Sequence, residues 1–112
     1  MNNDEIIALM RTTGIFFDED HPDHITVEKL NDGTIAPPFL EYDVIEEVVR
    51  ADGMPYLRYN RVNVRKYDDI DDGTTHTMFR EAMDAQEIAY RMTAHEYDDE
   101  LGLWVTKYTF TI

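Results

Sequence analysis

The 112-residue chain contains no cysteine and no serine. The absence of cysteine excludes disulfide bonds, zinc sites with thiolate ligands and cysteine nucleophiles, and the absence of serine excludes a serine nucleophile. The five glycines are scattered singly, so the chain has no glycine-rich phosphate-binding loop. We therefore expect a protein that is not an enzyme and needs no cofactor.

Long apolar runs are also missing. A membrane-spanning helix needs about 20 apolar residues, and the longest uncharged apolar runs here are a few residues long. The N-terminus has no basic segment followed by an apolar core, which a signal peptide would show. The sequence predicts a soluble cytoplasmic protein with no membrane partner.

Basic residues are scarce, at 10 Lys and Arg against 24 Asp and Glu, for a formal net charge of -14. Nucleic-acid binding depends on clustered Lys and Arg. The one basic concentration alternates along a predicted strand, which places Arg61 and Arg65 on one face and Arg58 and Lys66 on the other. This spacing disfavours nucleic acid as a direct partner.

The apolar content is nevertheless sufficient for a core. Hydrophobic residues make up 43% of the chain, and a chain of this length buries roughly two thirds of its unfolded surface. No internal repeat, low-complexity tract or linker interrupts it. We expect a single domain over residues 1–112.

The first half predicts one helix followed by extended segments. Asn2 or Asn3 is a suitable N-cap, and Gly14 is a suitable stop. The apolar stripe between them consists of Ile6, Ile7, Leu9 and Met10. We expect extended structure at 15–17, 25–29 and 39–45 and a turn at 31–33. Residues 45–50 fit either a continuation of the strand or one helical turn, and we favour strand and loop.

The second half predicts a strand, a helix and a closing hairpin. We expect strands at 56–67, 88–97 and 103–112, acidic turns at 68–72 and 98–102, and a helix at 74–86 capped by Asp72. Its apolar face consists of Met78, Phe79, Ala82 and Met83, and its outward residues are His76, Thr77, Arg80, Glu81 and Asp84. The predicted fold is α+β: a mostly antiparallel sheet of four to five strands with the N-terminal helix and the 74–86 helix packed on it.

Alternation along the last strand separates two faces. Trp104, Thr106, Tyr108, Phe110 and Ile112 form the expected core face. Leu103, Val105, Lys107, Thr109 and Thr111 form the other face, which we interpret as a surface or a subunit contact.

The acidic residues offer candidate sites that we interpret as structural. His21 and His24 lie among Asp18, Glu19, Asp20 and Asp23, but Pro22 disfavours the helical turn that would bring both imidazoles to one metal. We interpret this segment as a solvated loop without a metal. The runs at 68–72 and 96–100 lie in predicted turns, where carboxylates stay hydrated and lack the shifted pKa that acid–base catalysis needs.

Several phrases occur in an order that resembles a known family. They are Pro37-Pro-Phe-Leu-Glu-Tyr42, Ala51-Asp-Gly-Met-Pro-Tyr56 leading into a strand that ends Val64-Arg-Lys-Tyr67, Ile88-Ala-Tyr90 after the helix, and Tyr97 before an acidic turn and the last strand. This order resembles the small tail-completion or tail-terminator proteins of phages with long non-contractile tails and of prophages of Gram-positive bacteria. The resemblance spans most of residues 14–112. Gly53 stands where that family commonly has Asn, and Trp104 where it commonly has Tyr.

The resemblance implies a structural protein that forms a ring, typically a hexamer, caps the tail tube, ends its polymerisation and joins the head. The implied partners are further copies of the chain, the tail tube protein and a head-completion or connector protein, with DNA only passing through the channel. The implied location is the virion tail or neck, and the host cytoplasm during assembly. We expect the acidic loops to be assembly or channel-facing elements: Asp68, Asp69, Asp71, Asp72, Asp98, Asp99 and Glu100.

Two alternatives remain open from the sequence. Very acidic small phage proteins can mimic the charge of a DNA duplex and inhibit a host nucleic-acid-binding protein, but mimicry requires acids along one continuous surface. Another neck role, such as head closure, is hard to distinguish from tail termination.

Overall fold

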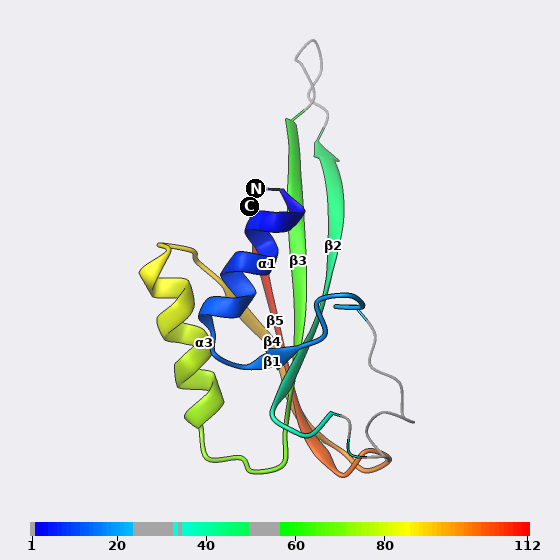
Figure 1. The fold of residues 1–112 in the computed structure, drawn as a ribbon. Coiled ribbons are helices and arrows are strands. Elements are labelled where there is room, and N and C mark those ends of the chain that lie inside the picture. The colour runs from blue at the N-terminus through cyan, green and yellow to red at the C-terminus, as the bar shows by residue number, and fades with distance from the viewer. Residues whose placement is uncertain (1, 24–32, 34, 50–56) are drawn as a thin grey trace.

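The computed structural model describes residues 2–23, 33, 35–49 and 57–112, with Val49, Leu57 and Arg58 described by backbone alone. The elements, in chain order, are α1 (Asn3–Thr12), β1 (Phe16–Phe17), β2 (Phe39–Val49), β3 (Leu57–Asp68), α3 (Thr74–Ala85), β4 (Arg91–Asp98) and β5 (Leu103–Thr111) (Figure 1). The predicted α+β class is confirmed. Neither α1 nor α3 is long and apolar enough to cross a membrane.

The five strands form one sheet in the order β1-β2-β3-β5-β4. The short β1 runs parallel to β2, and every other neighbouring pair is antiparallel. The final hairpin, β4 and β5, was predicted from the sequence and is confirmed. Both helices lie on the same face of the sheet (Figure 1), which leaves the other face uncovered by helices. We call the first the helix-bearing face and the second the open face.

The first helix begins and ends as predicted. The Asn2 side chain accepts a hydrogen bond from the backbone N–H of Glu5, and the Glu5 carboxylate accepts one from the N–H of Asn2, which completes a capping box. Gly14 follows the helix at φ +73°, a left-handed conformation that favours glycine. A Cβ there would lie 3.2 Å from the terminal methyl of Met78, so the helix stop also lets α3 approach.

The main core lies between the two helices and the sheet. Alternate residues of the central strands point into it, as their period-2 pattern predicts. The predicted apolar face of α3 is confirmed, because Phe79, Ala82 and Met83 are buried and Met78 is half-buried. The other buried members are Ile6, Leu9, Met10, Ile15, Phe17, Leu40, Tyr42, Val62, Val64, Tyr108 and Phe110.

A second, smaller cluster lies at one end of the open face. Ile35, Phe39 and Leu103 are buried there against Tyr67 and Leu101, and Phe39 stacks on Tyr67 at 4.7 Å between ring centroids. This corrects the prediction for the second face of the last strand. Its first residues, Leu103 and Val105, are buried, and Leu103 packs in this cluster with Ile35, which precedes β2.

The β2–β3 hairpin projects beyond the rest of the sheet (Figure 1). The β3–β5 pairing ends at Arg61 opposite Thr111, with a last pair of backbone hydrogen bonds between Asn60 and Ile112. The β2–β3 pairing continues to Val49 opposite Leu57. The molecule is accordingly elongated, at 53 × 27 × 25 Å. We call residues 46–49 and 57–60, which pair with each other beyond the end of β5, the arm.

Several predicted boundaries need correction. Asp68 is not in a turn: it is the last residue of β3 and is buried. The N-cap of α3 is Gly73 rather than Asp72. The fourth strand starts at Arg91 rather than Ile88, because the backbone N–H groups of Gln86, Glu87 and Ile88 bond to the last carbonyls of α3. The predictions at 25–29 and 31–32 lie outside the described residues.

Replacing Phe79 by alanine tests the core assignment. The Phe79 side chain is fully buried, so Phe79→Ala should lower the free energy of unfolding by about 3–5 kcal/mol in denaturant melts. Phe16→Ala is the matched control, since Phe16 is 54% exposed and its loss should change stability by about 0.5 kcal/mol or less. Similar losses for the two variants would contradict the assignment.

Candidate assembly surfaces

The two predicted acidic loops lie at the same end of the molecule. Trp104 of β5 is paired with Asp68 of β3 on one side and with Tyr97 of β4 on the other. The loop after β3 and the loop after β4 therefore leave the sheet at the same end of the strands, opposite to the arm (Figure 1). The exposed acids of this end are Asp69, Asp71, Asp72, Asp99 and Glu100, and Asp98 is half-buried.

Three of these acids have partners: two bond to the backbone of their own loops and one contacts a histidine of β4. Asp72 accepts a hydrogen bond from the N–H of Thr74, which lowers the pKa of its carboxyl. Asp98 accepts from the N–H groups of Glu100 and Leu101, each at 3.0 Å. Asp71 lies 3.1 Å from the Nε2 of His95 and so links its loop to β4. The expectation that all of these carboxylates are simply hydrated is therefore too broad.

Asp68 differs most from its prediction, because it forms a buried ion pair with Lys66. Their side chains are 7% and 4% exposed, and Nζ lies 2.5 Å from Oδ2. Thr75 of α3 completes the group by accepting from Lys66 at 2.7 Å and donating to Asp68 at 2.6 Å. The sequence contained the signal for this pair, since Lys66 and Asp68 continue the inward alternation of Val62 and Val64. We call these three residues the Lys66 cluster.

His76 was predicted to point outward, and this is wrong. It is half-buried, and its Nδ1 lies 2.8 Å from the hydroxyl of Tyr108. The two rings stack at 5.8 Å between centroids. Burial, with a smaller effect of the positive charge of Lys66, lowers the pKa of His76. Helical spacing alone places this residue on the edge of the apolar face, where its ring can turn inward.

A cavity of about 250 Å³ opens beside the Lys66 cluster. Its rim includes two exposed apolar side chains, Ile70 at 66% and Met92 at 44%. Its walls include the rings of His76 and His95. The cavity is smaller than the roughly 300–1,000 Å³ of typical small-molecule sites. Its lining includes Lys66, Asp68 and Thr75, which already bind one another.

Charged side chains of β2 and β3 form a ladder on the open face. Arg61 pairs with Glu47, and Arg65 lies 3.0 Å from Asp43 and 3.4 Å from Glu41. The prediction that Arg61 and Arg65 share the face opposite Lys66 is confirmed. The side chain of Arg58 lies outside the described residues. These arginines thus pair with neighbouring acids and do not form a phosphate-binding stripe.

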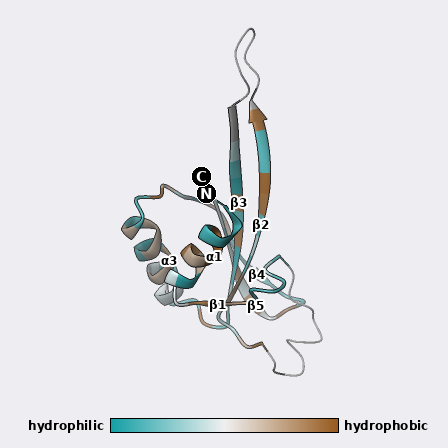
Figure 2. Ribbon diagram, turned by 45° about the horizontal axis from the view of Figure 1, so that its top comes forward, coloured by the Kyte–Doolittle hydropathy of each residue, from teal (hydrophilic) through white to brown (hydrophobic). Residues whose placement is uncertain are grey.

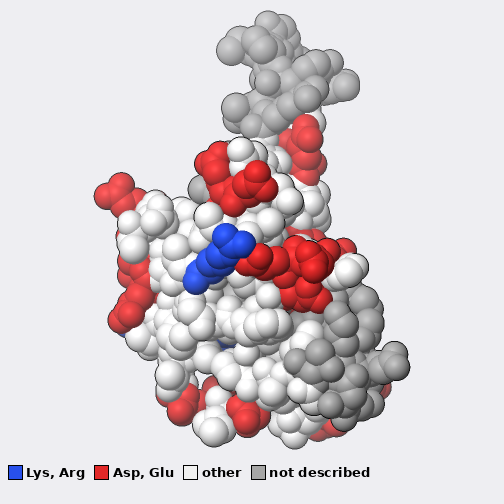
Figure 3. Space-filling view, viewed as in Figure 1, with Lys and Arg blue, Asp and Glu red and all other residues white. Residues whose placement is uncertain are grey.

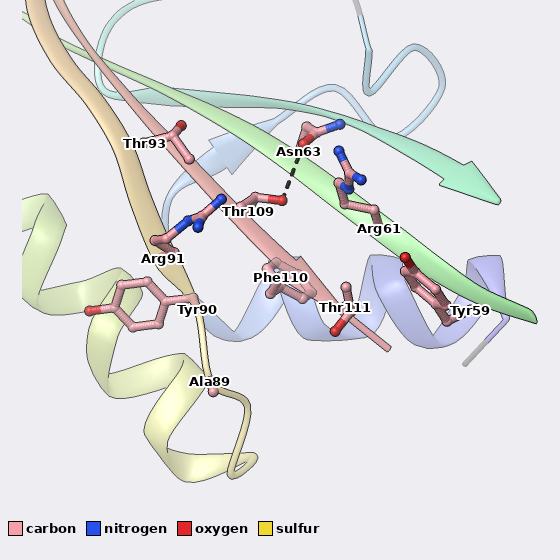
Figure 4. Close-up of a pocket in the computed structure, with 10 residues that line it drawn as sticks. All are labelled: Tyr59, Arg61, Asn63, Ala89, Tyr90, Arg91, Thr93, Thr109, Phe110 and Thr111. Atoms are coloured by element: carbon pink, nitrogen blue, oxygen red, sulfur yellow. Dashed lines mark hydrogen bonds between the residues drawn. The ribbon is translucent and has the colours of Figure 1, made fainter. Parts of the chain in front are cut away.

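A groove of about 550 Å³ continues this face across β5 and β4 (Figure 4). Polar side chains from three strands line it, and Thr109 donates to Asn63 at 3.3 Å. Arg61 and Arg91 extend over it, with Tyr59 on the side of the arm (Figure 4). The open face is thus polar and carries cations, whereas acids outnumber cations on the helix-bearing side (Figure 3).

The described part of the 18–24 segment is held by local bonds. Asp18 accepts from the N–H groups of Asp20 and His21 and lies 3.9 Å from the His21 ring. Glu19 forms an ion pair with Arg11. Among the described residues, no group of three or more potential ligands is arranged for a metal; His24 lies outside them.

Compared with known proteins, the chain matches no family model and no curated protein. The resemblance to tail-completion proteins therefore rests on the phrases quoted above.

Removing one member of the buried ion pair should be costly. Lys66→Met leaves Asp68 buried without its partner and should lower the free energy of unfolding by about 3–5 kcal/mol. The double variant Lys66→Met, Asp68→Leu should recover most of that loss. Arg61→Met is the control, because its pair with Glu47 is more exposed and should be worth about 1 kcal/mol or less. A double variant as unstable as Lys66→Met alone would contradict the assignment.

His76 should make stability depend on pH. Because its folded pKa is lowered, the unfolded chain binds a proton more readily than the folded chain. The stabilisation is therefore present above the usual histidine pKa of about 6.5 and is lost as the pH falls below it. His76→Gln should reduce the fall in Tm between about pH 7.5 and about pH 5.5. His21→Gln should keep the full fall, since the His21 side chain is 72% exposed; an unchanged fall in His76→Gln would refute the assignment.

Proposed function

We propose that the chain is a structural phage protein that caps the tail tube as a ring, ends tube polymerisation and contributes to the head–tail joint. The observation that carries the proposal is the projecting arm. Val48 on the arm is 49% exposed, and Val44 and Ile45, which precede the arm on β2, are 38% and 46% exposed; Figure 2 shows hydrophobic stretches along β2 up to its projecting end. An isolated two-stranded ribbon is only marginally stable in water, so a partner is expected to cover it.

The polarity of the subunit also supports the proposal. One end bears the arm and the other bears the two acidic loops, so the two ends offer different surfaces. A ring that ends a polymer needs such a difference, because one side binds the last tube ring and the other must not bind a further tube ring. Within this proposal, the loops at 69–72 and 98–100 face the joint or the channel, where carboxylates repel passing DNA.

The proposed partners follow from these surfaces. They are further copies of the chain in a hexameric ring, the tail tube protein, and a head-completion or connector protein. The protein acts in the virion tail or neck after assembly in the host cytoplasm, and it has no catalytic role. The ladder of arginine–carboxylate pairs on the open face favours this function over DNA mimicry, because cations interrupt a continuous negative surface.

Deleting the gene from its phage tests the proposal. We expect normal heads together with tails of uncontrolled length or tails that fail to join heads, because stacked rings stop growing only when a terminal ring offers no tube-binding surface. Electron microscopy of the particles gives the measurement, and a plasmid copy of the gene should restore normal particles. Tails of normal length joined to heads in the deletion phage would refute the function.

A further inference from the structure

Within the described residues, the sheet has two edge strands that have no neighbouring strand on their outer side along part or all of their length. On one side, β1 covers only Phe39 and Leu40 of β2, and the N–H of Tyr42 donates to the carbonyl of Pro22 at 2.7 Å. Beyond that point, residues 43–49 pair with β3 alone within the described chain. On the other side, β4 pairs with β5 alone. Each edge therefore presents a row of donors and acceptors that another strand can use.

Some of the features that protect edge strands from pairing are missing here. Edge strands are commonly shielded by lysine and other charged residues, by proline or by very short length. The part of β2 beyond Tyr42 carries Asp43, Glu46 and Glu47 but neither lysine nor proline, and β4 contains neither of these two over its eight residues. The single irregularity of β4 is a shift in register between Met92 and Ala94. On one side of this bulge, Ala94–Asp98 pair regularly with β5.

We propose that β2 of one copy pairs with β4 of the next copy, antiparallel, so that the sheets of neighbouring subunits become continuous. This inference deepens the proposed ring and rests on it for the closure of the assembly. The contact is heterologous, because two different edges meet, and heterologous contacts close into rings when the rotation allows. Pairing an extended strand with an exposed sheet edge is a common mode of association.

The lengths of the two edges agree. The part of β2 beyond Tyr42, from Asp43 to Val49, has seven positions. Strand β4 has eight residues but also occupies seven positions, since its ends pair with Leu103 and Thr109 of β5 and the bulge absorbs one residue. A full-length antiparallel pairing therefore places Arg91 opposite Val49 and Asp98 opposite Asp43.

The side chains agree in the same register. Val44 and Val48 are four positions apart on the helix-bearing face, because Val44 is opposite the inward-pointing Val62. Met92 and Tyr97 are also four positions apart on that face, as shown by their partners Tyr108 and Trp104. Both are exposed, at 44% and 49%. The proposed register places Val48 against Met92 and Val44 against Tyr97, two apolar cross-strand pairs.

The remaining positions are mostly polar. Glu46 falls opposite His95, whose Nδ1 lies 2.8 Å from the Thr106 hydroxyl and whose Nε2 lies 3.1 Å from Asp71. Glu47 falls opposite Ala94, and Ile45 falls opposite Glu96. Asp98 falls opposite Asp43, which is the least favourable pair. The Asp43 carboxylate is already bound by Arg65 at 3.0 Å and by Asn63 at 3.1 Å, and this reduces its repulsion of a second acid.

The direction of pairing follows from the sheet itself. Along the order β2-β3-β5-β4 the strands alternate in direction, so β2 and β4 of one subunit are antiparallel. A rotation about an axis roughly along the strands keeps these directions, and β2 then meets the next β4 antiparallel. Within one copy, Met92 is aligned with Tyr42 across the sheet. In the proposed contact, Met92 pairs instead with Val48 of the neighbouring copy, so neighbouring copies are offset along the strand direction. Closed sheets require an offset of this kind, because their strands tilt relative to the axis of the ring.

The absence of cysteine makes a direct test practical. Residues directly opposite in antiparallel strands have Cα atoms about 4.5–5.5 Å apart, within the range that a disulfide spans. In one copy the two positions are separated by three strand spacings, about 14 Å, and by about 20 Å along the strands. A disulfide between Val48→Cys and Met92→Cys therefore reports contact between copies.

Two single variants of different mass are mixed and mildly oxidised, as purified protein and in cells assembling particles. We expect a linked dimer from Val48→Cys with Met92→Cys and from Val44→Cys with Tyr97→Cys. The first matched control is Val44→Cys with Met92→Cys, a pair that is out of register. The second is Val48→Cys with Arg80→Cys, because Arg80 is exposed on α3, away from both edges. The double variant Val48→Cys, Met92→Cys should give a series of disulfide-linked oligomers, the largest of which has as many subunits as the ring.

Several outcomes would overturn the contact. Rings that form without the Val48–Met92 link would overturn it and leave the proposed function standing. Links from the out-of-register pair instead of the proposed ones would overturn the register and direction. No link in either preparation would also overturn it. Conversely, the expected links together with normal tails in the deletion phage would support the contact and reject the proposed function.

Discussion

The stacking of Phe79 of α3 on Tyr108 of β5, at 4.1 Å between ring centroids, is the contact on which the arrangement of the molecule depends. It fixes α3 to the same face as α1, whose Met10 is fully buried in the same core. The start of α3 is thereby held over the end of β3, where Thr75 reaches the pair of Lys66 and Asp68. The loop between β3 and α3 must then stay at that end, beside the β4–β5 turn.

Covering one face of the sheet has consequences for the other face and for the edges. A two-layer domain of this size buries one face well, and the open face stays soluble through its own polar side chains. Here this is achieved by ion pairs such as Arg65 with Asp43 and by hydrogen bonds such as Thr109 to Asn63. The chain can therefore carry a large negative charge while its cations neutralise acids locally, and the excess acid lies at the loops and helices.

The parts predictable from sequence were those governed by one local rule. The alternation of apolar and polar residues correctly predicted the central strands and the inward direction of Tyr108 and Phe110. The capping signals of Asn2 and Gly14 correctly predicted the bounds of α1. The errors arose where a tertiary contact overrides residue type. The acidic run that contains Asp68 is typical of a turn, yet Asp68 is buried, because Lys66 and Thr75 bind its carboxylate oxygens. His76 reads as outward, yet Tyr108 binds its ring. Leu103 packs in one cluster with Ile35, which periodicity does not place.

The bulge in β4 shows why the side chains on a sheet edge must be compared by the positions they pair with on the neighbouring strand and not by residue number. Met92 and Tyr97 are five residues apart, and without the bulge they would point to opposite faces. The extra residue returns both to the helix-bearing face and gives them the spacing of Val44 and Val48 on β2. Bulges commonly twist an edge away from partners, but this one aligns an apolar pair instead. An edge that is both unpaired and aligned in this way is better explained by a partner strand than by exposure to solvent.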